Sequence, residues 1–473
     1  MTQDCSSSEL RPLGLVILLL GLFLPLTDFF IVNVALPTID HDLHASPGML
    51  QLVVAGYGTA YAVLLVVGAR VGDAIGRRRL FVLGMGAFTV TSLVCGLAPN
   101  VLVLVLARAA EGAAAAMMLP QVLSTIHTAA DGPSRARALG YYGVAGGLAT
   151  VAGQLLGGLL VSANIAGTGW RPIFLLNVPV GILGVLLSRN IPATRSNAPT
   201  PVDGAGTSVL GATLLAFLIP LTEGRSLGWP LWTIFLLCLS PILAVLFILV
   251  ERRVEAGGGV PVVPLSVISV RSFWRGTVTG TLFFISFGGF MFVYALCLQD
   301  GAGWSALRTG LTMVPLACGY LAASLAMPRL LARIGTWMLT IGAMFLVFGF
   351  ALLAVVLTAG WPHPAVVPLC AASLAIGIGQ GMILTPLFRI MLSEVPLHLA
   401  GVGSGVLNTM QQTSLVVGVA TVGSLYLSDS NAKVLGVLHA TVLVLVALAL
   451  VEILVGWSTR GLPDAARERA QRS

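Results

Sequence analysis

The sequence predicts an all-α integral membrane protein with fourteen transmembrane helices. Of its 473 residues, 57% are hydrophobic and 9% are charged, whereas soluble domains carry about 25% charged residues. Apolar runs of about 20 residues recur along the chain, and each is long enough to cross the hydrocarbon core of a bilayer. Runs such as 13–26 and 440–455 lack the alternation of a barrel strand, so helices are expected. This composition excludes a water-soluble protein.

Hydropathy and turn residues place the helices and divide the chain into two six-helix halves with two inserted helices between them. Breaks are expected at clusters of turn-forming residues such as 99–100 and 131–133. The expected helices span residues 13–36, 48–70, 79–98, 101–126, 137–163, 170–190, 204–223, 231–251, 272–297, 306–330, 336–359, 365–393, 400–427 and 435–457. The corresponding segments are an N-terminus 1–12, a first half 13–190, a linker 191–203, an inserted pair 204–251, a loop 252–271, a second half 272–457 and a tail 458–473.

A weak internal repeat supports two related halves. Arg70 and Gly76 bracket the segment after the second expected helix, and Arg329 and Gly335 bracket the segment after the tenth. The spacing between Arg and Gly is the same in both segments. Matching segments at equivalent places in two halves are typical of duplicated transporter folds.

The basic residues predict the orientation of the chain. With the N-terminus inside, 20 of the 25 Lys and Arg residues fall on the cytoplasmic side and four fall outside, with Arg108 within a helix. Such a bias across short loops sets orientation, so both termini are expected in the cytoplasm and the protein in the cell membrane. The first apolar run has no basic segment before it, which favours a retained helix over a cleaved signal.

Several classes of function are disfavoured by what the sequence lacks. The net charge is +7, but the basic residues are scattered, so no nucleic acid partner is expected. The six cysteines show no CxxC spacing and the histidines do not cluster, so no metal is expected. The absence of a P-loop disfavours direct use of ATP, and no nucleophile motif indicates an enzyme. The expected energy source is a proton gradient, with no cofactor.

Asp28 is the first candidate for proton coupling. It lies in the outward half of the helix 13–36, where an Asp costs about 2.5–3.5 kcal/mol at the membrane centre on insertion scales. A protonatable site facing a cavity is the functional interpretation. An Asp at the membrane interface, solvated from outside, is the alternative.

Arg108 and Glu111 are the other two proton-coupling candidates. Arg108 lies about 11 Å along the helix 101–126, at a depth that makes it the candidate partner of Asp28; a structural Arg bonded to backbone carbonyls is the alternative. Glu111 lies on the same helical face. It either neutralises Arg108 permanently or provides a second proton or cation site.

Four short stretches carry a family resemblance. Residues 28–37 read DFFIVNVALP, 68–80 read GARVGDAIGRRRL, 108–112 read RAAEG and 153–158 read GQLLGG. These stretches resemble motifs of helix 1, the loop between helices 2 and 3, helix 4 and helix 5 in the fourteen-helix drug:proton antiporter family of the major facilitator superfamily. The chain departs from the usual family residues at Phe29, Phe30, Ala74, Glu111 and Gln154.

The resemblance implies a gate, an antiporter helix and a substrate cavity. The implied cytoplasmic gate, with its Asp at a helix N-terminus, comprises Asp73, Gly76, Arg77 and Arg78. The implied helix-5 motif comprises Gly153, Gln154, Gly157 and Gly158. Close helix packing accounts for these glycines and for Gly143, Gly146 and Gly147 before them. The substrate-cavity candidates are Phe29, Phe30, Asn33, Asn408, Gln411 and Gln412, of which the last three could equally form helix-to-helix hydrogen bonds.

The predicted function is secondary active export by alternating access. Small lipophilic compounds such as drugs, antibiotics or related metabolites would leave the cytoplasm in exchange for protons, through a monomer. Proton-coupled uptake is the alternative among transporters, and a membrane sensor derived from the fold is the alternative of another class.

Overall fold

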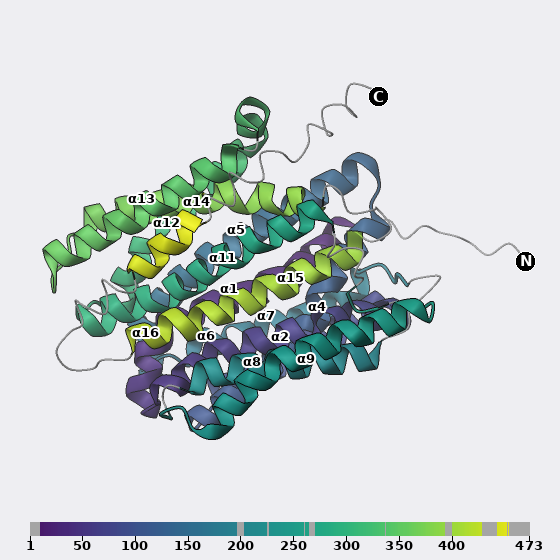
Figure 1. The fold of residues 1–473 in the computed structure, drawn as a ribbon, viewed down its shortest axis with the longest axis horizontal. Coiled ribbons are helices and arrows are strands. Elements are labelled where there is room, and N and C mark those ends of the chain that lie inside the picture. The colour runs from purple at the N-terminus through teal and green to yellow at the C-terminus, as the bar shows by residue number, and fades with distance from the viewer. Residues whose placement is uncertain are drawn as a thin grey trace, which may run out of the picture.

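The computed structural model describes residues 10–195, 203–224, 227–259, 261–263, 270–335, 337–392, 400–427, 442–451 and 453, and its regular elements there are all helical (Figure 1). Twelve of the described helical stretches are long and apolar enough to cross a membrane. Figure 1 shows the helices as a bundle of roughly parallel and antiparallel rods. The predicted termini, linker and loop lie partly outside the described residues, at 1–9, 196–202, 264–269 and 454–473.

The first twelve expected spans each coincide with one of these stretches. They are α1 (Pro12–Leu43), α2 (Pro47–Ile75), α3 (Arg77–Gly96), α4 (Val101–Ala129), α5 (Gly132–Ala163), α6 (Pro172–Leu175) with α7 (Asn177–Leu187), α8 (Gly204–Glu223), α9 (Leu231–Ala256), α11 (Arg271–Leu296), α12 (Ala306–Ile334), α13 (Trp337–Gly360) and α14 (Val366–Leu392).

The last two expected spans are described only in part. α15 (Ala400–Gly418) continues through a π-helical turn, Val419–Gly423, into α16 (Ser424–Tyr426), within the predicted range 400–427. A shorter apolar helix, Val442–Val451, lies within the predicted range 435–457. The rest of that last range falls outside the described residues.

Proline misled the prediction of where α1 ends. The expected end was residue 36, before Pro37, but α1 continues through Pro25 and Pro37 to Leu43. Prolines are tolerated within membrane helices because neighbouring helices and polar side chains satisfy the backbone groups that proline leaves unpaired. The helix ends instead at His44, whose φ of 48° is left-handed and whose N–H donates to the Asp40 carbonyl at 2.8 Å.

We name the two ends of the bundle after the first and last residues of α1, as the Pro12 end and the Leu43 end. The Leu10 N–H donates to the Ala129 carbonyl at 3.2 Å, so α4 ends at the Pro12 end. α2, which follows α1 after a short turn, also ends there.

Helix packing repeats between the two parts of the chain. In the first part α1 packs on α5, while α2 and α3 pack on α4; in the second part α11 packs on α15, while α12 and α13 pack on α14. The parts meet through α5 against α12 and α2 against α15, which are equivalent pairs. Such a repeat is the arrangement of a duplicated transporter fold.

Two glycines show how closely the repeated helix pairs match. Gly112 and Gly377 each lie eleven residues after the start of their helices, α4 and α14. A Cβ at Gly112 would lie 2.1 Å from the Tyr57 carbonyl oxygen of α2, and a Cβ at Gly377 would lie 1.9 Å from the Leu316 carbonyl oxygen of α12. Both crossings therefore depend on a residue without a side chain.

The helices α8 and α9 form a separate pair beside the bundle. They pack on each other, and α8 packs on α2, as the lower part of Figure 1 shows. The segment after α9 also binds α2, because Arg70 donates to the Pro261 carbonyl. Glu251 of α9 accepts from the Val263 N–H at 2.7 Å. The pair is thus attached to α2 at the Pro12 end.

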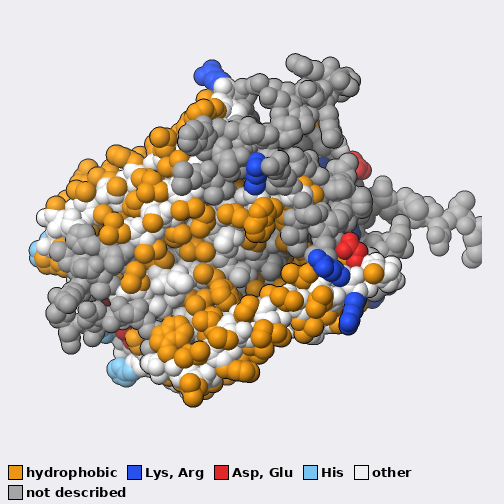
Figure 2. Space-filling view, viewed as in Figure 1, with side chains coloured by type: hydrophobic (Ala, Val, Ile, Leu, Met, Phe, Trp, Pro, Cys, Tyr) orange, Lys and Arg blue, Asp and Glu red, His pale blue; other side chains and the backbone are white. Residues whose placement is uncertain are grey.

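The outer surface suits a bilayer. Among the described residues on the face in Figure 2, hydrophobic side chains are spread widely and few charged side chains lie among them. Exposed apolar residues of α9, such as Phe235, Ile242 and Val245, are 57–64% accessible. In water such a surface would aggregate, whereas in a membrane it contacts lipid.

Candidate functional site

A buried ionic cluster lies within the first six-helix part. Asp28 of α1 and Arg108 and Glu111 of α4 are all 0% exposed. A single nitrogen of the guanidinium, Arg108 Nη1, donates to Glu111 Oε2 at 2.7 Å and also to Asp28 Oδ2. We call these three residues the carboxylate–arginine cluster. With both carboxyl groups ionised it holds two negative charges and one positive charge.

Polar side chains from α3 and α7 form hydrogen bonds with the two carboxyl groups of the cluster. Asn177 Nδ2 donates to Asp28 Oδ1 at 3.1 Å and to Ser92 Oγ at 3.2 Å. Ser92 donates to Glu111 Oε1, and Cys95 Sγ lies 3.5 Å from Glu111 Oε2. Among the described residues, no second cation contacts the cluster.

The helix α2 supports Arg108 from the other side. Arg108 Nε donates to the Val53 carbonyl at 3.1 Å, and the guanidinium lies 4.4 Å from the centre of the Tyr57 ring. The second guanidinium nitrogen, Nη2, has no hydrogen-bond partner among the described residues. A guanidinium over an aromatic face gains a cation–π interaction, which accounts for the location of the tyrosine.

The structure brings the three predicted proton-coupling residues together and corrects the expected location of Asp28. Arg108 contacts Asp28, as depth matching suggested, and it also bonds a backbone carbonyl. Asp28 neither lines a cavity nor lies at a solvated interface, because it points at α4. Phe30, two residues further, lies about 200° around the helix and faces the opposite side.

Sequence reasoning missed four members of this site. Asn177, Ser92, Cys95 and Tyr57 contact the cluster from α7, α3 and α2, where no proton-coupling residue was predicted. A signal existed for Asn177 alone, because it is an amide within the apolar range 170–190. Ser, Cys and Tyr are common in membrane helices and gave no indication.

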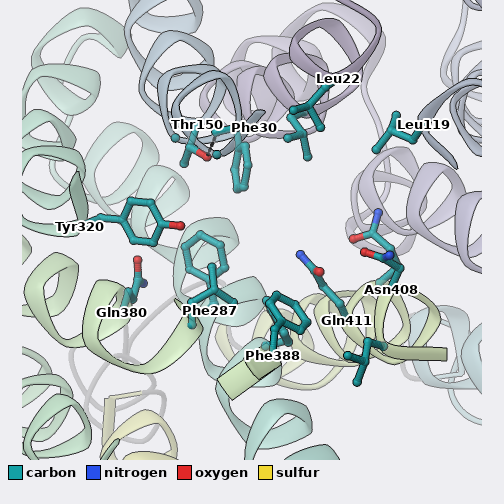
Figure 3. A pocket seen from close by; sticks show the side chains of 18 of the residues that line it. Leu22, Phe30, Leu119, Thr150, Phe287, Tyr320, Gln380, Phe388, Asn408 and Gln411 are labelled. Carbon is teal, nitrogen blue, oxygen red and sulfur yellow. Dashed lines mark hydrogen bonds between the residues drawn. The ribbon is translucent and has the colours of Figure 1, made fainter. Parts of the chain in front are cut away.

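A cavity lies between the two six-helix parts, nearer the Pro12 end. Its volume is about 470 Å³, within the range of small-molecule sites. Phe30 lines it from α1, and Figure 3 shows that ring above the Tyr320 hydroxyl and the Gln411 amide. Asn408 and Gln412 of α15 also line it.

Two of the six predicted cavity residues lie elsewhere. Phe29 packs against Tyr57, with ring centres 5.9 Å apart. Asn33 Nδ2 donates to the Phe29 carbonyl at 3.0 Å, one turn earlier on its own helix. Neither residue lines the cavity. The prediction was wrong because α1 is apolar on every side, so its sequence does not reveal which face meets the second half.

The glycines of α5 divide into two groups, which corrects the expectation that all of them pack helices. Gly143, Gly146 and Gly147 line the cavity. By contrast, a Cβ at Gly153 would lie 2.8 Å from the Phe30 Cβ, and one at Gly158 would lie 2.8 Å from the Ala306 carbonyl oxygen. The second group therefore packs α5 on α1 and α12.

The other two residues of the helix-5 motif also lie at helix contacts. A Cβ at Gly157 would lie 3.0 Å from the Ile31 carbonyl oxygen of α1. Gln154 is buried, and its Nε2 lies 3.5 Å from Met291 Sδ of α11. The motif thus lies where α5 contacts α1 of its own part and α11 and α12 of the second part.

The two parts are joined at the Leu43 end. Gln51 Nε2 and Ser424 Oγ lie 3.1 Å apart across the boundary between α2 and α16. The Leu307 N–H donates to Ser162 Oγ at 2.9 Å. These two hydrogen bonds hold the parts together at that end.

The predicted gate residues lie at the Pro12 end. Asp73 Oδ1 accepts from Arg77 Nε at 3.0 Å and from Nη2 at 2.7 Å. Arg77 Nη1 also donates to the Ser124 carbonyl, 3.3 Å away, and to Thr128 Oγ1. Asp73 lies in the last turn of α2, which corrects its expected place at a helix N-terminus.

The remaining gate residues join α2 and α3 to the segment after α7. Gly76, with φ 106°, forms the corner between the two helices, in a conformation that a side chain disfavours. The Arg77 N–H donates to the Thr194 carbonyl at 3.0 Å, and Arg78 Nη1 donates to the Ile191 carbonyl at 3.4 Å. Among the described residues, all these contacts stay within the first part of the chain and the linker that follows it.

A membrane-spanning bundle whose repeated halves enclose a cavity is the architecture of a transporter. The chain belongs to the Major Facilitator Superfamily, whose family model matches residues 18–419. Members of this superfamily are transporters and not enzymes, and they move small molecules across membranes as multi-pass membrane proteins.

Two relatives and one solved structure illustrate the similarity. The chain is 34% identical to the probable actinorhodin transporter of Streptomyces coelicolor, over 85% of this chain and 70% of the relative. It is also 34% identical to the puromycin resistance protein pur8 of Streptomyces alboniger, over 91% and 86%. A crystal structure of a mutant peptide transporter POT with alafosfalin matches with a TM-score of 0.72 and 13% identity, over 98% of this chain and 99% of that one. The last match shows the fold alone.

We expect Arg108→Ala to destabilise the protein far more than Glu111→Gln. The alanine variant leaves two buried carboxyl groups without their cation, and breaking a buried ion pair costs about 3–5 kcal/mol. The glutamine variant keeps a side chain of the same shape that can still form hydrogen bonds. The difference in thermal stability is measured by heating the detergent-purified variants and monitoring the remaining folded protein by size-exclusion chromatography. Equal losses of thermal stability would contradict the central place given to Arg108.

Proposed function

We propose that this protein exports small lipophilic molecules from the cytoplasm in exchange for protons. The observation that carries the proposal is the carboxylate–arginine cluster, fully buried in one six-helix half beside a cavity between the halves. The relatives named for actinorhodin transport and puromycin resistance favour antibiotics or related metabolites as cargo. The protein works as a monomer in the cell membrane, without a cofactor.

In this proposal the chain crosses the membrane fourteen times. Residues 13–190 and 272–457 form the two halves, and α8 with α9 is inserted between them. The repeated packing supports this division, and the partly described ranges 400–427 and 435–457 supply the last two spans. In this proposal the Pro12 end is cytoplasmic, since the fourteen-helix topology expected from the sequence puts 20 of the 25 Lys and Arg residues on that side.

The charge of the cluster supports its role as the proton carrier. With Asp28 and Glu111 both ionised, one negative charge stays uncompensated in the protein interior, which is energetically costly. One proton on either carboxyl group cancels that charge. Binding and release of one proton therefore change the net charge of the first half at mid-membrane, which can bias the equilibrium between two conformations.

The cavity position supports alternating access. With the Pro12 end cytoplasmic, the halves meet at the outer end and the cavity lies toward the cytoplasm, as in an inward-facing state. Conversion to the outward-facing state separates Gln51 from Ser424 and closes the Pro12 end. Asp73, Gly76, Arg77 and Arg78 form the cytoplasmic gate in that closed state.

Uptake by proton symport uses the same parts. We favour export because both named relatives are a transporter or a resistance protein for an antibiotic. A sensor without transport would need neither a proton-binding cluster nor a cavity between movable halves.

We expect Asp28→Asn to abolish proton exchange while the protein still folds, because the amide oxygen still accepts a hydrogen bond from Arg108 or Asn177 but the amide does not titrate. In energised everted vesicles, adding a substrate outside should cause protons to leave the lumen when the wild-type protein is present. No such release is expected with Asp28→Asn. Asp42→Asn is the matched control, since Asp42 also lies on α1 but is held at its exposed end by Arg171. Proton uptake would instead indicate symport, and normal release by Asp28→Asn would exclude Asp28 as the carrier.

We expect Asp73→Asn to slow turnover with little change in substrate affinity. Asp73 Oδ2 accepts no hydrogen bond among the described residues, so it is available to the second half when the Pro12 end closes. An exposed ion pair contributes about 0.2–1 kcal/mol, enough to shift a two-state equilibrium several-fold. In a background without other cysteines, a Gly143→Cys thiol in the cavity should react faster with a thiol reagent added on the cytoplasmic side when Asp73→Asn is present than when it is absent.

The control is Asp131→Asn, which removes another Asp–Arg pair at the same end. Its labelling rate should match that of the parent protein. A large loss of affinity with Asp73→Asn, without faster labelling, would place Asp73 in the substrate path instead of the gate.

A further inference from the structure

The described residues that form the walls of the cavity carry no formal charge. None of the described residues lining it is Asp, Glu, Lys, Arg or His. Asp28 and Arg108 of the carboxylate–arginine cluster are 0% exposed and bonded to each other. A charged molecule in the cavity would therefore lose water without meeting an opposite charge.

One wall of the cavity is aromatic. Phe283 and Phe287 lie one turn apart on α11, with ring centres 6.3 Å apart and planes inclined by 27°. Phe30 of α1 lies 5.8 Å from Phe287. Phe284 and Phe388 form a further ring pair, 6.4 Å apart. Such rings stack on other flat aromatic surfaces.

The wall on α5 has a stretch without side chains between Tyr142 and Thr150, which also line the cavity. Gly143, Gly146 and Gly147 lie three and four residues apart, on one face of the helix. A Cβ built on Gly143 would meet no atom within 4 Å, and one on Gly147 would approach only the Tyr320 ring, at 3.7 Å. This surface leaves room for a planar ring.

Neutral hydrogen-bonding groups complete the lining. Gln380 of α14 and Gln411 of α15 line the cavity with Tyr320 of α12, and Figure 3 shows their polar ends directed into the space between the helices. Amides and hydroxyls both donate and accept hydrogen bonds without a net charge. They suit carbonyl and hydroxyl groups at the edge of a ring system.

We propose that the cavity selects uncharged, planar aromatic molecules with hydrogen-bonding groups at their rim, and discriminates against permanent cations and anions. The inference rests on the proposed export function and names the cargo of the same cavity. Aromatic faces attract cations weakly, but none of the described lining residues is a carboxylate that could compensate for the lost hydration of a cation. The two buried acids are bonded to Arg108 and are not available to a cationic substrate.

Three probes built on one ring system test this inference. They are 2-(hydroxymethyl)anthraquinone, its analogue with a trimethylammonium-methyl group, and anthraquinone-2-sulfonate. Quenching of tryptophan fluorescence in the purified protein gives the three dissociation constants. We expect the uncharged probe to bind at least about tenfold more tightly than either ion. Binding of the cation as tightly as the uncharged probe would overturn the proposal.

A charge placed in the cavity provides a second, independent readout. Gln411→Glu should improve the affinity for the cationic probe about tenfold relative to the uncharged one. Gln411→Leu is the control, because it removes the amide without adding charge and should bring no such gain. Failure of the cation to gain affinity in a folded Gln411→Glu variant would show that Gln411 does not contact the ligand, and would contradict the proposal. The wild-type affinities alone decide the matter if the variant folds poorly.

Transport of the same probes separates this inference from the export function. Selective binding of the uncharged probe without proton release in everted vesicles would contradict export and leave the selectivity standing. Proton release driven equally well by the cationic probe would contradict the selectivity and leave export standing.

Discussion

The rest of the structure depends on one buried guanidinium that is shared by two carboxyl groups. Arg108 Nη1 binds both Asp28 and Glu111, and none of the three side chains reaches solvent. An ion this deep in a membrane protein must have its charge and its hydrogen bonds satisfied internally. Here α1, α2, α3, α4 and α7 each contribute a group, so five helices of the first half converge on the cluster. With two carboxylates and one guanidinium, the cluster keeps one negative charge that a proton can balance. The same residues therefore hold the helices of the first half together and carry the proposed proton chemistry.

Aromatic contacts connect this cluster with the cavity. Tyr57 lies under Arg108 and stacks on Tyr61, which lines the cavity, with ring centres 6.4 Å apart. The cluster is thus connected through two stacked rings with a side chain that lines the cavity. An uncharged substrate also has an energetic consequence. Exchange for one proton then uses both the membrane potential, about 2.3 kcal/mol per 100 mV, and the pH gradient, about 1.4 kcal/mol per unit. Together they sustain a gradient of roughly a few hundredfold.

The parts of this account that depend on hydropathy and charge could be predicted from the sequence, and the parts that depend on helix rotation could not. The apolar runs placed twelve described spans, and depth along α1 and α4 suggested the pairing of Asp28 with Arg108. The rotation of α1 was not predictable, because apolar residues surround it on every side; Phe29 and Asn33 were therefore assigned to the wrong face. Asn177 and Ser92 reach the cluster only through tertiary packing, which no local pattern reports. For the glycines of α5, spacing alone could not separate those that pack helices from those that line the cavity.

The central claim is that substrate binding and protonation of the carboxylate–arginine cluster are coupled. Isothermal titration calorimetry of the purified protein, in buffers of different ionisation enthalpy, counts the protons released as an uncharged aromatic probe binds. Linkage requires that a proton displaced by binding appear in the buffer. The account predicts release of about one proton per bound probe by the wild-type protein, and none by Asp28→Asn. Release of the same size by Asp28→Asn and by Glu111→Gln would show that the proton comes from elsewhere and would contradict the account.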